Sequence, residues 1–245
     1  MATKKPTTAV AVKPASSGNI VSIQDALKAQ VAALSGRVSA PTGSQIRLTQ
    51  DKQFSLPDGT KTPGPLQLVV VEFSNRNMFY DADFDKKNPT PPACFSIGID
   101  PKSMAPSKNS PVVQSADCTN CPMNAYGSKG KGKACSNNKL LAVLPPDADE
   151  DTPMWLLNVS PTAGKAFDKF VGDASRIFQM PPVGVVVTVG FNPNETYAQL
   201  SFTDIQANPN VGAHFARQDE ARRMLAAEPD VSGFVKKPAA KSGRR

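Results

Sequence analysis

The sequence predicts a mainly β fold of the α+β class, built as a small antiparallel barrel with a few short helices. Strand-like runs recur along residues 66–205, and one amphipathic helix interrupts them. Strands and helices do not alternate in the way that indicates a doubly wound parallel sheet. The chain of 245 residues has 23 prolines and 40% hydrophobic but only 7% aromatic residues, which suits one core with many turns. Together these features favour an OB-like barrel.

The strands are expected where β-branched or alternating apolar residues lie between turn-forming residues. The clearest is Leu66–Phe73, a valine-rich run between Pro65 and Asn75. Weaker alternation around Ile46 and Phe54 predicts two short strands before it. The remaining strands are predicted at 93–99, 139–144, 154–159, 184–191 and 197–205, with a hairpin at 192–195 between the last two.

Helices are expected at three places. The first is predicted at residues 22–36, from an apolar stripe that begins after a capping serine and ends at a glycine. The second should follow Ser160 as N-cap, with Pro161 in its first turn and with Phe167 and Phe170 on its apolar face. The third, at 217–226, is charged and weakly amphipathic.

The chain is expected to divide into three parts. These are a flexible basic arm at 1–19, an OB-like domain at 20–227 with a zinc module at about 94–135, and a disordered basic tail at 228–245. The two ends lack periodic apolar residues, so they bury too little surface to offset the entropy lost on folding. No long apolar run or signal peptide is present, which predicts a cytoplasmic protein that does not enter a membrane.

The cysteines are the most informative residues of the chain. Cys94, Cys118, Cys121 and Cys135 are all that it has, and the middle two form a Cys-x2-Cys pair. Such a pair binds one tetrahedral ion from a single turn, and two further thiolates complete the shell. A reducing cytoplasm favours a metal over disulfides. We therefore expect one structural Zn²⁺ ion, with reduced core thiols or oxidised cysteines as the alternatives.

A glycine-rich strip, Tyr126–Lys133, lies between the last two cysteines and carries Lys129, Lys131 and Lys133. The chain has a net charge of +7, and residues 94–139 hold six basic and two acidic residues. Positive potential of this kind attracts phosphate groups. The alternative is that the lysines neutralise the negative charge of a Zn²⁺ ion with four thiolate ligands.

Exposed aromatic side chains among cations would be the remaining parts of a nucleic-acid interface. Phe79 and Tyr80 follow Arg76, and Tyr126 opens the glycine-rich strip, so these four are expected to contact bases and phosphates. Packing in the core or in the zinc module is the alternative for each aromatic ring. No constellation of acid, base and nucleophile is present, and we expect a protein without enzymatic activity.

The cysteine region resembles a group of bacteriophage proteins that are encoded near replication genes. The resemblance covers about residues 66–205 and is carried by Cys118-x2-Cys121-Pro-Met-Asn124, Gly127-Ser128, Lys131-Gly-Lys133-Ala-Cys135 and the apolar strand that follows. The plan is also similar to that of the single-stranded-DNA-binding protein of T-even phages, which sets a zinc site inside an OB barrel. That protein has a histidine ligand and an acidic tail, whereas this chain has four cysteines and a basic tail.

Residues and resemblance together favour a zinc-stabilised protein that binds single-stranded DNA with low sequence specificity, in phage DNA replication or recombination. RNA is an open alternative as the ligand, and replication or recombination proteins are the other expected partners. The competing interpretation is a zinc-ribbon adaptor that binds a polymerase or a virion protein. The sequence carries no signal of oligomeric state.

Overall fold

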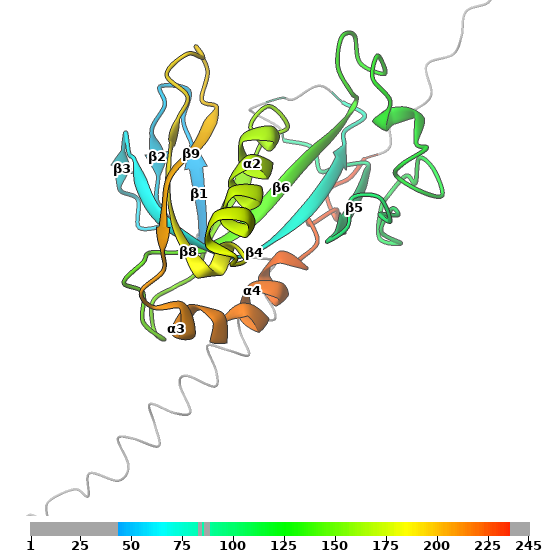
Figure 1. Cartoon of the computed structure of the whole chain (residues 1–245). Coiled ribbons are helices and arrows are strands. Elements are labelled where there is room, and N and C mark those ends of the chain that lie inside the picture. The colour runs from blue at the N-terminus through cyan, green and yellow to red at the C-terminus, as the bar shows by residue number, and fades with distance from the viewer. Residues whose placement is uncertain (1–43, 83–84, 86–88, 236–245) are drawn as a thin grey trace, which may run out of the picture. The chain divides into compact units, whose positions relative to one another are not determined.

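The computed structural model describes residues 44–82, 85 and 89–235. The predicted arm at 1–19, the predicted helix at 22–36 and residues 236–245 of the predicted tail lie outside these ranges. Within them the fold is mainly β with few helices, as predicted, and the strands form one curled sheet (Figure 1). None of the helices in these ranges has the length and apolar character that crossing a membrane requires.

The sheet contains nine strands. They are β1 (Gln45–Leu48), β2 (Phe54–Ser55), β3 (Lys61–Thr62), β4 (Leu66–Phe79), β5 (Cys94–Gly98), β6 (Cys135–Leu144), β7 (Trp155–Val159), β8 (Val185–Phe191) and β9 (Leu200–Ala207). The helices are α2 (Gly164–Asp173), α3 (Val211–Ala216) and α4 (Gln218–Leu225), with a π-helical turn, η3 (Ala174–Phe178), and two 3₁₀ turns, η2 (Pro122–Asn124) and η4 (Pro182–Gly184).

The strand order is β3-β2-β1-β7-β6-β4-β8-β9, and β5 pairs with β4 beside this path. All neighbours are antiparallel except β1 and β7, which are parallel. The sheet is therefore mixed, whereas an antiparallel barrel was predicted. It curls into a half-barrel, because the right-handed twist of each strand accumulates across the sheet (Figure 1).

Strand β4 connects the two parts of the sheet. It pairs with β6 along Val69–Phe79, while its other edge pairs with β8 at Leu66–Leu68 and with β5 at Asn75–Phe79. The β4–β6 register shifts between Val70 and Glu72, so Val71 is the extra residue of a β-bulge. Gln218 of α4 donates a hydrogen bond to the carbonyl oxygen of Val71, which satisfies a group close to the break in the ladder.

The main core lies inside the half-barrel, where α2 packs against the curled sheet (Figure 1). Phe167 and Phe170 of α2 are buried, and their rings contact Phe73 of β4 and Phe202 of β9. The buried core residues are Ile46, Phe54, Leu68, Val70, Leu141, Val143, Leu157, Val159, Ala163, Phe167, Phe170, Ala174, Val185, Val187, Val189 and Leu200.

Side chains, rather than strand pairing, join the β1–β3 region to the β8–β9 hairpin. The rings of Phe54 and Phe191 stack with their centroids 4.4 Å apart. Lys52 donates to the carbonyl oxygens of Asn192 and Glu195 in the hairpin loop. A Cβ atom on Gly64 would stand 2.7 Å from the Phe54 ring, so this glycine is needed for the ring to lie there.

The outer face of β4 and β6 is covered by α4. Ala221 and Leu225 of this helix are buried against a second apolar cluster, which includes Val69, Leu140 and Leu144. Arg222 forms an ion pair with Glu72 beside the bulge. The sheet thus has an inner layer around α2 and an outer layer under α4.

Most predicted elements are present, with different limits. Strand β4 extends six residues beyond the predicted end at Phe73, and β6 begins at Cys135 rather than at Lys139, because polar residues continue both strands. Helix α2 begins one turn later than predicted: Ser160 and Pro161 form a turn, and Ala163 occupies the N-cap position. Strand β3 and helix α3 were not predicted, because neither has an apolar period long enough to recognise.

His214 of α3 should make the stability of the domain depend on pH. It is 1% exposed, its Nδ1 lies 2.9 Å from Asn208 Nδ2, and burial together with nearby Arg217 lowers its pKa below the ordinary 6.5. His214 therefore binds a proton more readily in the unfolded chain than in the native state. The free energy of unfolding should therefore fall as the pH drops below about 6.5, the value in an unfolded chain. Urea titrations at several pH values measure this.

The matched variant is His214→Gln, which keeps a polar side chain and cannot take up the proton. Its unfolding free energy should vary less with pH in the same range, although its stability at neutral pH will be lower. Equal pH dependence in the two proteins would contradict this role of His214.

Candidate metal centre and adjoining polar groove

The sheet itself positions two of the four cysteines. Phe79, the last residue of β4, is paired with Cys94 on one side and with Cys135 on the other. Residues that pair directly across a sheet point to the same face, so both cysteines share a face with the Phe79 ring. Their Cα atoms are two strand spacings apart, roughly 10 Å. A disulfide needs Cα atoms within about 7 Å, so Cys94 and Cys135 cannot form one without backbone movement.

The connection between β5 and β6, residues 99–134, brings the other two cysteines to the same place. Its backbone folds back onto β5, where Ser107 N–H donates to the carbonyl oxygen of Phe95, and within the connection Cys118 N–H donates to the carbonyl oxygen of Met104. Only Met104 and Cys118 are buried apolar residues in this connection. Two buried apolar residues are too few to order a segment of this length. Small modules with so little apolar core are usually stabilised by a metal ion or by disulfides.

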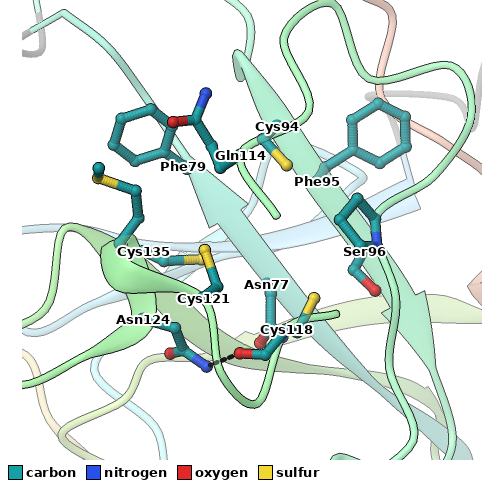
Figure 2. Close-up of a pocket in the computed structure, with 12 residues that line it drawn as sticks. Asn77, Phe79, Cys94, Phe95, Ser96, Gln114, Cys118, Cys121, Asn124 and Cys135 are labelled. Atoms are coloured by element: carbon teal, nitrogen blue, oxygen red, sulfur yellow. Dashed lines mark hydrogen bonds between the residues drawn. The ribbon is translucent and has the colours of Figure 1, made fainter. Parts of the chain in front are cut away.

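All four cysteines line one cavity. Figure 2 shows Cys94 from the start of β5, Cys135 from the start of β6, and Cys118 and Cys121 from the connection around a common space. The cavity has a volume of about 20 Å³, enough for one atom or ion. Phe79, Phe95 and Met123 also line it, so the walls away from the sulfur atoms are largely apolar.

The electrostatics of Cys135 reflect this clustering. Burial, followed by the proximity of Cys118, Cys121 and Cys94, raises the pKa of its thiol to about 12, and only Lys133 acts in the opposite direction. A divalent cation among the sulfur atoms would reverse this balance and stabilise thiolates. As placed, however, no group of three or more His, Cys, Asp or Glu side chains in the described ranges forms a set that could hold a metal ion. The four-cysteine site therefore stays a prediction.

The glycine-rich strip, which connects Cys121 to Cys135 in the chain, forms a compact loop. Gly127 N–H and Lys129 N–H both donate to the carbonyl oxygen of Gly132, and Gly127 and Gly130 adopt left-handed φ angles of 88° and 58°. Such angles are accessible to glycine at little cost. Tyr126 is 84% exposed, and the Nζ of Lys133 lies 5.4 Å from the centroid of its ring. Lys129 and Lys131 are exposed.

The remaining predicted contacts lie in different surroundings. Phe79 is partly buried and forms part of the cavity wall, whereas Tyr80 is 45% exposed at the end of β4. Arg76 points to the opposite face from Phe79, where its Nη2 donates to the carbonyl oxygens of Leu225 (3.0 Å) and Ala227 (2.9 Å) at the end of α4. Burial lowers its pKa to about 10, so it stays charged at neutral pH. This arrangement accounts for Arg76 without a nucleic acid.

A second, larger hollow adjoins the cysteine cavity, and the sequence did not reveal it. We call it the polar groove; its volume is about 380 Å³. Asn77 and Asn124 line both spaces. Within the described ranges no carboxylate lines the groove, whose residues are Asn75, Asn77, Pro101, Lys102, Thr119, Asn124, Lys133, Asn137, Asn138 and Lys139.

Amide side chains hold two of the groove lysines in place. Lys133 Nζ donates to Asn124 Oδ1 (3.3 Å) and to Asn137 Oδ1 (3.0 Å), and Lys139 Nζ donates to Asn75 Oδ1 (3.1 Å). The amides are fixed in turn. Asn137 Nδ2 donates to Asn77 Oδ1 at 2.7 Å, and Asn124 Nδ2 donates to the carbonyl oxygen of Cys118 at 2.7 Å (Figure 2). One hydrogen-bond network therefore joins the backbone at Cys118 to the groove.

A signal for the groove was present in the sequence. Asn75 and Asn77 are two residues apart, as are Asn137 and Lys139, and this is the strand period. Polar residues at such spacing predict a polar face, but the apolar runs before and after them dominated the strand assignment. Asn75 pairs with Lys139 and Asn77 with Asn137, so the four side chains meet on one face.

Comparisons with known proteins identified no matching family model, no similar curated protein and no similar solved structure. The resemblance to phage proteins consequently stays an interpretation of the motifs.

Arg76 gives a prediction about stability. Replacing it by Met keeps the aliphatic part of the side chain but leaves the carbonyl oxygens of Leu225 and Ala227 without their charged donor. Hydrogen bonds to charged groups contribute about 1.5–3 kcal/mol. Arg76→Met should therefore lower the free energy of unfolding by about 2 kcal/mol, measured by urea titration. Arg223→Met, at an exposed position of α4, should change it by less than about 0.5 kcal/mol. Equal losses would contradict this role.

Proposed function

We propose that this chain is a non-enzymatic, zinc-stabilised protein that binds single-stranded nucleic acid. The observation that supports it best is the convergence of all four cysteines on one cavity, together with the cationic glycine-rich strip between two of them in the chain. The motif resemblance favours DNA as the ligand and phage DNA replication or recombination as the setting. An OB-type identity for the half-barrel belongs to the same proposal.

Zinc is the ion that suits this donor set. Four sulfur ligands in a tetrahedral shell are typical of structural Zn²⁺, with Zn–S distances of about 2.3 Å. Cys118 and Cys121 would bind from the loop, and Cys94 and Cys135 from the ends of two strands. The sulfur atoms would have to move closer together to surround the ion, because as placed they do not form a set that could hold it. The ion would then link the connection at 99–134 to strands β5 and β6, and so stabilise a segment that has few apolar contacts of its own.

The glycine-rich strip, Tyr126–Lys133, supports the nucleic-acid part of the proposal. Tyr126 is the most exposed aromatic side chain in the described ranges. It lies beside Lys133, and the same short loop carries Lys129 and Lys131, so a stacked base and its neighbouring phosphates would meet suitable groups together. Lys133 also offsets part of the rise in the pKa of the Cys135 thiol, so this lysine can serve the metal site and a phosphate at once.

The zinc proposal predicts one Zn²⁺ ion per chain in protein purified without a metal-affinity step, measured by elemental analysis. Structural zinc contributes on the order of 10 kcal/mol to small modules. Removal of the ion by a strong chelator should therefore abolish amide-exchange protection in residues 99–134, while β8 and β9 keep theirs. Cys118→Ser should lose most of the zinc, and Thr119→Ser, at an exposed position of the same loop, should retain it. Native protein with no bound transition metal would refute the site.

The stacking proposal predicts that Tyr126→Ala weakens binding to a labelled oligo-dT strand, measured by fluorescence anisotropy. Stacking on an aromatic side chain contributes about 1–3 kcal/mol per base. The dissociation constant should consequently rise by at least about fivefold. Tyr197→Ala removes a tyrosine that is 45% exposed near the β8–β9 hairpin, and it should leave the affinity unchanged. An adaptor that binds only proteins would show no binding by the wild type.

A further inference from the structure

The polar groove is a cationic channel built from three separate segments. Lys102 comes from the turn after β5, Lys133 from the end of the glycine-rich strip, and Lys139 from the middle of β6. None of the described residues that line the groove is acidic, and Asp168 beside it is paired with Lys139, so the lining has a net positive charge. Clefts lined by one sign of charge focus the electrostatic potential and attract ligands of the opposite sign.

Two of these cations are fixed before any ligand arrives. An ammonium group has three N–H donors, and Lys133 uses two of them on the carbonyl oxygens of Asn124 and Asn137. Lys139 uses one on Asn75 and pairs with Asp168 of α2 at 3.2 Å. In each case one donor is left to point at an anion. Binding would then require little further ordering of the lysine side chains.

The groove is large enough for more than one phosphate, because its volume of about 380 Å³ lies in the range of sites that hold drug-sized ligands. Lys133 and Lys139 are six residues apart, so at most about 20 Å separates their Cα atoms. Tyr126 lies beside Lys133 and marks one end, and Asp168 beside Lys139 marks the other. The asparagine amides between them are occupied in holding the lysines, which leaves few groups free to distinguish one base from another.

We propose that the polar groove is the path of the nucleic-acid backbone: a single strand runs from Tyr126 past Lys133 to Lys139, with Lys102 on the opposite wall, and its phosphates bind these lysines. This inference rests on the proposed function and adds a site that the glycine-rich strip alone does not provide. Asn77 and Asn124 belong to both the groove and the cysteine cavity, so the metal module would shape one wall of the channel.

The test replaces the two groove lysines that lie outside the strip. Lys102→Gln/Lys139→Gln leaves Lys129, Lys131 and Lys133 in place, so it separates the groove from the loop. Its affinity for oligo-dT at low salt should fall at least about tenfold. The slope of log affinity against log salt should lose about 1.4, because each phosphate contact on a single strand contributes about 0.7. The matched control is Lys61→Gln/Lys108→Gln, at exposed positions outside the groove, which should bind like the wild type.

Two results would overturn the groove while leaving the proposed function intact: wild-type affinity and salt slope in the groove variant, or equal losses in the groove variant and its control. Failure of the wild type to bind any strand would instead overturn the proposed function, and the groove with it. Binding of poly-glutamate as tight as that of oligo-dT would also overturn the nucleic-acid path, because it would indicate an acidic polypeptide as the ligand.

Lysine footprinting on the unmodified protein gives an independent measurement that does not depend on folding of a variant. Oligo-dT should protect Lys102, Lys133 and Lys139 from acetylation, and Lys61 and Lys108 should react equally with and without the strand. Unchanged reactivity of Lys102 and Lys139 in the saturated complex would contradict the proposal. The same experiment with oligo-rU shows whether the path accepts RNA as well.

Discussion

The pairing of β4 with β6 along Val69–Phe79 is the interaction on which the rest of the structure depends. In its first half, apolar side chains fill both faces of the ladder and support α2 inside and α4 outside. In its second half the two strands leave the core and continue as polar sequence. The backbone hydrogen bonds between these two strands extend the ordered sheet beyond the core as far as Phe79, which is paired with Cys135 on one side and with Cys94 on the other.

This extension explains how two kinds of site adjoin each other. A cavity lined by sulfur atoms lies at the tip of the ladder, and a groove lined by amides and ammonium groups lies behind it on the same face. Asn124 connects them, because it bonds to the Cys118 backbone and to Lys133. A change in the conformation of the backbone at Cys118 should therefore alter the position of Lys133. The arrangement suits a module whose metal orders the binding surface and takes no part in chemistry.

The sequence allowed much of the fold to be predicted, for reasons that particular residues show. The valines of β4 and β8 mark buried strands, and the Phe167–Phe170 pair marks the inner face of α2. The cysteine spacing indicated one cluster, and the structure places all four around one cavity. The parallel β1–β7 pair could not be predicted, because register between distant strands leaves no local pattern. The hydrogen bonds of Arg76 could not be predicted for a similar reason, because the carbonyl oxygens that accept them, those of Leu225 and Ala227, are distant in the chain.

The bulge at Val71 fixes which residues form each surface beyond it. Val71 and Glu72 both lie on the outer side of the ladder, and from there the inner positions are Phe73, Asn75, Asn77 and Phe79. Because both residues lie on the outer side, removal of Val71 would restore an unbroken ladder and leave the faces of all later residues unchanged, whereas removal of one residue just beyond the bulge would exchange those faces. The asparagines would then face α4, and Arg76 would enter the groove. The length of the strand beyond the bulge is therefore as constrained as its composition, and homologous chains of this fold should differ there by substitutions and not by single-residue insertions or deletions.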